Sequence, residues 1–133
     1  MRPGRRRIAL PLRPGCLAEL RAWARSWMRG NPTDADADAV LLALIELVTN
    51  SAKHGAGPVD VSMRRELRQL RLDVTDRSDR LPVQPATGDD VEGGRGVALL
   101  DVLATSWGVL LRRPSGKTVW CRFSAAGPHP SSE

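Results

Sequence analysis

An acidic residue and a carboxamide share one face of a predicted helix in the segment "ELVTNSAKHGAG", residues 46–57. Glu46 and Asn50 stand four residues apart, and side chains at this spacing lie one above the other on a helix. A carboxamide oxygen suits a hard cation such as Mg²⁺, and a carboxylate one turn away can accept a proton from an attacking hydroxyl or water. The alternative is that both side chains lie on the solvent face and only keep the helix soluble.

Two later segments favour the functional interpretation. "LDVTDRSDRLP" ends an alternating strand at Asp76, where a carboxylate can accept a hydrogen bond from an exocyclic amine. "EGGRGVALLD" places Gly93, Gly94 and Gly96 at a helix start, where backbone N–H groups unblocked by side chains suit phosphate oxygens. Simpler explanations exist for each, with Asp76 as a turn residue and the glycines as a hinge. Three such segments in this order are much stronger evidence than one glycine cluster.

The same segments resemble the histidine-kinase-like ATPase superfamily, to which the ATP-binding domains of gyrase, chaperones, histidine kinases and mismatch-repair proteins belong. Within it, the chain is most similar to the stand-alone anti-sigma-factor serine/threonine kinases and their actinobacterial relatives. "ELVTNSAKHG" matches their N-box, "DRSDRLP" the first glycine-box, "GGRGVALLD" the second, and "WGV…GKTVWCRF" the last hairpin. The resemblance covers about residues 15–123, and the N-box match is highly specific.

The resemblance implies ATP and Mg²⁺ as cofactors and assigns roles to individual positions. Asn50 would bind the Mg²⁺ that bridges the ATP phosphates, Glu46 would be the general base, and Asp76 would hydrogen-bond the adenine amino group. The other nucleotide-binding positions that it implies are Lys53, Ser78, Gly94, Arg95, Gly96 and Thr118.

Among these positions, Gly94 and Gly96 would cradle phosphate, and Thr118 would support the adenine end. Lys53 and Arg95 would add positive charge near the phosphates, although a solvated side chain explains either residue equally well. His54, at the helix end, is interpreted as a cap residue, because a protonated histidine there suits the negative end of the helix dipole.

The first glycine-box departs from the superfamily pattern. The superfamily has a glycine two residues after the aspartate and another two residues later, where this chain has Ser78 and Arg80. The lost backbone freedom bears on nucleotide binding and on whether phosphoryl transfer is retained. The lid "VQPATGDDVEGG" is short and acidic, and solvation is the role expected for its carboxylates.

Three functions are consistent with these residues. The leading one is an ATP-binding regulatory kinase that transfers the γ-phosphate to a serine or threonine of an anti-sigma antagonist protein, or binds a sigma factor, and so controls transcription; a homodimer is also implied. The second is a non-catalytic nucleotide-binding switch that acts through protein interactions. The third is a nucleic-acid binder, suggested by the excess of arginine and the N-terminal "RRR" arm, but with one Phe and no Tyr the chain lacks an aromatic stacking platform.

These residues need a scaffold, and hydrophobic periodicity predicts one. The expected order is a strand at 6–12, helices at 15–29 and 35–54, strands at 59–63 and 70–74, a loop at 76–96, a short helix from 97, and strands at 107–113 and 117–123. The prediction is an α+β two-layer sandwich, in which three helices cover one face of a mixed, mostly antiparallel sheet. Residues 1–123 form the single ATP-binding domain with a loose basic arm at 1–6, and 124–133 form a flexible tail.

The remaining expectations concern cysteines and location. Cys16 and Cys121 have no metal-ligand spacing, and the simplest interpretation is two buried thiols in a reducing compartment rather than a disulfide. No apolar run approaches the about 20 residues of a membrane span, and the N-terminal apolar stretch is too short for a signal peptide. The chain is therefore expected in the cytoplasm, without a membrane partner.

Overall fold

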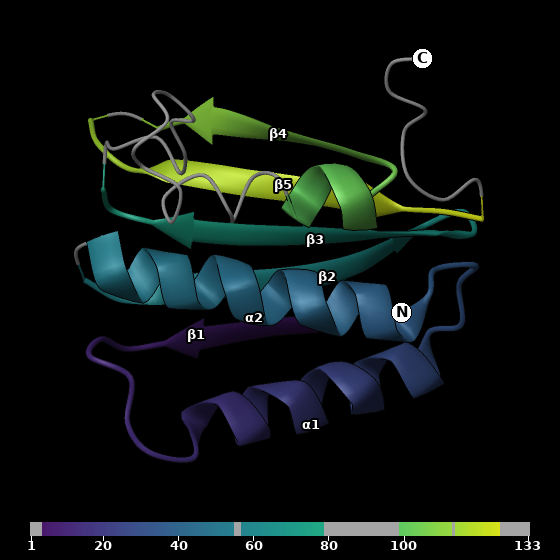
Figure 1. The fold of residues 1–133 in the computed structure, drawn as a ribbon, viewed down its shortest axis with the longest axis horizontal. Coiled ribbons are helices and arrows are strands. Elements are labelled where there is room, and N and C mark those ends of the chain that lie inside the picture. The colour runs from purple at the N-terminus through teal and green to yellow at the C-terminus, as the bar shows by residue number, and fades with distance from the viewer. Residues whose placement is uncertain (1–3, 55–56, 79–98, 113, 126–133) are drawn as a thin grey trace.

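The computed structural model describes residues 4–54, 57–78, 99–112 and 114–125 (Figure 1). Along the chain the elements are β1 (Gly4–Ile8), α1 (Cys16–Gly30), α2 (Ala37–His54), β2 (Val59–Glu66), β3 (Gln69–Asp76), β4 (Ser106–Leu111) and β5 (Lys117–Phe123). Residues 99–103 form a further helical segment before β4. Within the described residues, this order agrees with the order that hydrophobic periodicity predicts.

The strands form one sheet in the order β1-β2-β3-β5-β4, and each described neighbouring pair is antiparallel. In Figure 1, α1, α2 and the helical segment at 99–103 lie in front of the sheet, on the same face. The predicted α+β sandwich with helices on one face of the sheet is therefore confirmed.

The core lies between this sheet face and the helices, because apolar and polar residues alternate along the strands. From the sheet it takes Val59, Val61, Met63, Leu70, Leu72, Val74, Val119, Cys121 and Phe123. From the helices it takes Leu20, Ala24, Val40, Leu41, Ala43, Leu44, Leu47 and Val48. Fully burying a side chain such as leucine contributes about 1.5–3 kcal/mol, so this face holds the domain together. Both cysteines are free and buried, as predicted.

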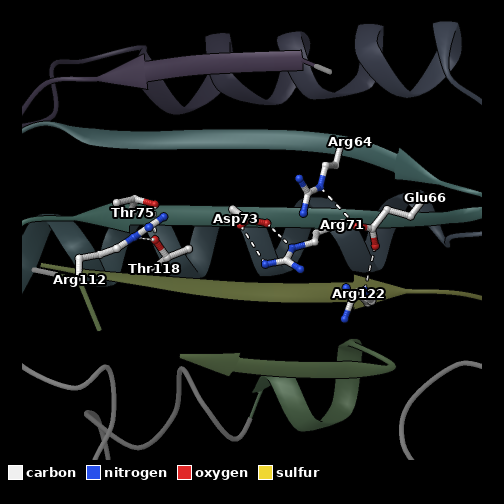
Figure 2. Close-up of polar contacts among 8 residues, drawn as sticks. All are labelled: Arg64, Glu66, Arg71, Asp73, Thr75, Arg112, Thr118 and Arg122. Atoms are coloured by element: carbon white, nitrogen blue, oxygen red, sulfur yellow. Dashed lines mark hydrogen bonds and ion pairs between the residues drawn. The ribbon is translucent and has the colours of Figure 1, made fainter. Parts of the chain in front are cut away.

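The opposite sheet face has no described helix over it and carries charged side chains (Figure 2). The guanidinium of Arg71 donates to the carboxylate of Asp73 over 2.8 Å, and that of Arg122 donates to Glu66 over 2.9 Å. Both guanidinium groups lie over the Trp120 ring, 5.2 and 5.1 Å from its centroid, within cation–π range. The hydrogen bond from Arg122 lowers the pKa of Glu66.

The first strand begins earlier than predicted. The sequence suggests residues 6–12 after a loose arm at 1–6, whereas β1 spans Gly4–Ile8 and pairs with β2 from Gly4↔Met63 to Ile8↔Val59. Residues 4–6 are therefore part of the sheet. Gly4 fits here because a Cβ atom at this position would collide with the indole ring of Trp27. The strand ends before Pro11, which has no N–H to donate to a neighbouring strand.

The start of α2 is also corrected, from about residue 35 to residue 37. Local capping preferences would favour Thr33 or Asp34 at this helix start, but the side chain of Asp36 accepts the backbone N–H of Asp38 over 2.9 Å. The carboxylate of Asp34 is instead engaged by Arg68 in a two-bond ion pair of 2.6 and 2.8 Å. A long-range partner thus takes the carboxylate that local sequence rules assign to the helix end.

The two pairs of consecutive strands predicted at 59–63 and 70–74 and at 107–113 and 117–123 each form an antiparallel hairpin. The β2–β3 turn consists of Leu67 and Arg68, and Leu67 has a positive φ of 58°. The β4–β5 turn closes with the backbone N–H of Arg112 donating to the carbonyl of Gly116 over 2.8 Å. β4 ends at Leu111 rather than at the predicted residue 113.

Candidate functional site

The acid–amide pair lies on the C-terminal half of α2. Glu46 and Asn50 are both half-buried. Within the part of the chain that the structure describes, no hydrogen bond or ion pair engages either side chain. The pair is therefore available to a ligand.

The end of α2 and the end of β3 lie at the same end of the sheet, where β5 begins (Figure 1). The chain that follows each element makes the contact between them. Gly57 has a positive φ of 74°, and a Cβ atom there would lie 3.0 Å from the Cδ of Arg77. The residue after Asp76 thus packs on the segment that leaves α2.

Asp76 is the last residue of β3, and its side chain lies on the helix-covered face in phase with Leu72 and Val74. Its Oδ1 accepts the backbone N–H of Ser78 over 2.9 Å. The ammonium of Lys117 lies 2.9 Å from each carboxylate oxygen, and the two residues are direct neighbours across β3 and β5. The predicted adenine-binding carboxylate is therefore already ion-paired.

Lys117 is the site residue that sequence analysis missed. The sequence contains a signal for it, because Lys117 alternates in phase with Val119 and Cys121, which face the core. A charged residue on this face needs a buried partner. Only the strand register identifies that partner as Asp76.

Gly116 allows Lys117 to reach Asp76. Its φ is +105°, and a Cβ atom there would lie 2.7 Å from the backbone carbonyl oxygen of Asp76. Glycine adopts this conformation without a steric penalty and leaves room for the turn to approach the end of β3. The close approach of the two backbones places the start of β5 beside the carboxylate.

Thr118 lies on the other face of the sheet (Figure 2). Its hydroxyl is 2.7 Å from that of Thr75 and accepts a hydrogen bond from Nε of Arg112 over 3.0 Å. The structure therefore does not bring the Thr118 side chain together with the Asp76 carboxylate, because neighbouring residues of a strand face opposite sides.

Some of the remaining predicted site residues lie in the described ranges, and the others lie outside them. Ser78 is buried. Within the described ranges Leu67 is the one non-glycine residue with a positive φ, so the backbone at Ser78 does not adopt a conformation that needs glycine. A serine therefore fits where the superfamily has glycine. Lys53 is exposed at the end of α2, as is His54, the predicted cap. The predictions for Arg80, Gly94, Arg95 and Gly96 and for the lid lie outside the described residues.

The donor set suits a magnesium ion that is held mainly by a nucleotide. The described ranges contain no group of three or more His, Cys, Asp or Glu that would hold a metal alone. Mg²⁺ usually keeps several waters and takes one or two protein oxygens together with substrate phosphates. A half-buried Asn50 without a hydrogen-bonding partner in those ranges fits such a ligand, and Glu46 stands one turn away.

Residues 10–123 match the model of the histidine kinase-like ATPase domain, and the chain belongs to this family. This family membership makes it an ATP-binding domain with a regulatory role. No curated protein matches the chain. No helix in the described ranges is long and apolar enough to cross a membrane.

Proposed function

We propose that the protein is an ATP- and Mg²⁺-dependent serine/threonine kinase of the anti-sigma-factor type. It transfers the γ-phosphate of ATP to a serine or threonine of an anti-sigma antagonist protein, or binds a sigma factor, and so controls transcription. The observation that carries the proposal is the Glu46–Asn50 pair, half-buried and without a hydrogen-bonding partner within the described residues. It lies in an ATPase-family chain, on the helix that ends beside β3.

The chemistry needs positioning and charge neutralisation more than covalent help. Asn50 would hold the Mg²⁺, which would supply positive charge to neutralise the phosphates. Glu46 accepts the proton of the attacking hydroxyl as its oxygen bonds to the γ-phosphorus, and ADP leaves with the bridging oxygen. Asp76 would bind the exocyclic amine of adenine, and Lys53 would contact phosphate together with Gly94, Arg95 and Gly96, the positions that the family resemblance assigns to phosphate.

The first experiment measures binding of ATP with Mg²⁺ by titration calorimetry. Asn50→Ala is expected to weaken Mg²⁺-dependent binding at least tenfold. The matched control is Gln69→Ala, which removes another carboxamide from an exposed position on the opposite sheet face. If Asn50→Ala binds as wild type does, the metal assignment is wrong.

The second experiment tests transfer, with γ-labelled ATP and purified candidate antagonist proteins. Glu46→Gln keeps the shape of the side chain but cannot accept the proton, and is expected to lose about 100-fold or more in rate while it still binds nucleotide. Asp38→Asn, an exposed substitution in the first turn of the same helix, is expected to keep the wild-type rate. A wild-type protein that binds ATP and Mg²⁺ but labels no antagonist would remove the kinase claim.

A non-catalytic nucleotide-binding switch is the second candidate. The buried pair of Asp76 and Lys117 favours it, because binding a base there disturbs an existing ion pair. The departures at Ser78 and Arg80 point the same way. A switch would keep its effect on transcription in Glu46→Ala, whereas a kinase would lose it.

A further inference from the structure

The ion pair between Asp76 and Lys117 differs from the other described ion pairs in its burial. Its side chains are 1% and 6% exposed, whereas in each of the others both side chains are at least 13% exposed. Removing two charges from water costs about as much as their attraction returns, so a buried ion pair is weak evidence of a role in stability. Its position at the predicted base-binding carboxylate suggests a different role.

The carboxylate of Asp76 has little acceptor capacity left. An ionised carboxylate offers about four lone-pair sites. Lys117 Nζ lies 2.9 Å from both oxygens, and Oδ1 also accepts the N–H of Ser78, so three of these contacts are made. What remains is one site on Oδ2, next to a charged donor that already contacts this oxygen.

A nucleotide base meets a competitor at this site. Hydrogen bonds from an ammonium group are roughly twice as strong as those from a neutral amine. An exocyclic amine that takes the remaining site on Oδ2 therefore shares this oxygen with a stronger donor, and the two contacts weaken each other. The strand register and the close approach at Gly116 hold Lys117 opposite Asp76, so the competitor is built into the sheet.

We infer that Lys117 is an internal competitor for the base-binding carboxylate of Asp76 and sets the affinity of this site for purine nucleotides. The ammonium keeps its contact to Oδ1 when a base amine takes the remaining site on Oδ2, and the weakened ammonium contact to Oδ2 reduces the net free energy of nucleotide binding. The inference rests on the proposed nucleotide site and adds a residue that lowers its affinity.

The experiment measures the affinities of ATP with Mg²⁺ and of adenosine for wild type, Lys117→Met and Lys117→Gln. Loss of one charge-assisted contact predicts that Lys117→Met binds both ligands about tenfold more tightly. Lys117→Gln keeps a neutral donor and is expected to shift in the same direction by less. Arg68→Met is the matched control, because it removes a cation from the exposed pair with Asp34 at the other end of β3.

Adenosine separates competition at the base from an effect on phosphate. A lysine that contacts phosphate would weaken ATP binding when removed and leave adenosine unchanged, which would overturn the inference. Equal or weaker binding of both ligands by Lys117→Met and Lys117→Gln, with wild type binding normally, would also overturn it while leaving the proposed function intact.

Failure of the proposed function has a different signature, in which wild type and all variants bind neither ligand. Circular dichroism establishes that each variant is folded before titration. If Lys117→Met is unfolded, Lys117→Gln carries the test, because its amide still donates to Asp76. Equal affinity of a folded Lys117→Gln and wild type then refutes the inference.

Discussion

Substitution of Gly116 by alanine tests whether the approach of the last hairpin to the end of β3 builds the site. The backbone φ at Gly116 is +105°, a conformation that strains any L-residue. In addition, the new Cβ would lie 2.7 Å from the carbonyl oxygen of Asp76, a backbone atom that cannot rotate away. The turn must therefore move, and Lys117, the next residue, moves with it.

The expected cost is the sum of two contributions. An L-residue forced to a left-handed conformation costs about 1–2 kcal/mol, and the shift forced by overpacking costs about 1–3 kcal/mol. Gly116→Ala is therefore expected to lower the free energy of unfolding by about 2–5 kcal/mol. Gly15 separates the contributions, since it has a φ of +84° but a Cβ atom added there would meet no atom within 4 Å. Gly15→Ala should cost only about 1–2 kcal/mol.

Urea unfolding followed by tryptophan fluorescence measures both variants, since the chain has four tryptophans. Gly30→Ala is the second control, because Gly30 ends α1 with a φ outside the left-handed range and with open space around it. It is expected to be neutral or slightly stabilising, since alanine favours a helix over glycine. Equal losses for Gly116→Ala and Gly15→Ala would refute the steric argument and with it the role of the close approach.

Two further predictions concern titration and thiol chemistry. The hydrogen bond from Arg122 lowers the pKa of Glu66 in the folded chain. The ionised carboxylate therefore stabilises the fold fully at pH values above the ordinary carboxyl pKa of about 4.3, and this stabilisation is lost as the pH falls through the lowered pKa. Glu66→Gln should therefore cost about 0.5–1 kcal/mol at pH 7 and nothing at pH 2, measured by urea unfolding; an unchanged difference at both pH values would contradict the pairing. Burial raises the pKa of Cys121 to about 12, and Cys16 is also buried, so a thiol reagent at pH 8 should modify both only at the rate of unfolding. Rapid labelling of the native chain would contradict the described core.

The sequence predicted the elements well because the hydrophobic pattern is strong. The apolar face of α2 and the alternation along β2, β3 and β5 each bury one side, and burial decides the fold class. The errors lie at element ends, where long-range partners act. Gly4 extends β1 because it accommodates Trp27, and Asp34 leaves the helix cap to Asp36 because Arg68 binds it.

The candidate site was predicted in part. Glu46, Asn50 and Asp76 follow from local spacing, and the structure places them on elements that end together. Lys117 could not be assigned, because its role depends on which residue of another strand stands opposite. The resemblance assigns Thr118 to the adenine end, and in the structure its hydroxyl lies 2.7 Å from that of Thr75.

The alternation at the beginning of β5 constrains how this protein can change. Lys117 and Thr118 are neighbours in the chain, yet the side chain of Lys117 lies on the helix-covered face of the sheet and that of Thr118 on the opposite face. A sideways shift of this strand would alter both surfaces at once, so neither can be remodelled through a backbone change without affecting the other. Engineering of one surface therefore has to proceed through side-chain exchanges that preserve the strand's position.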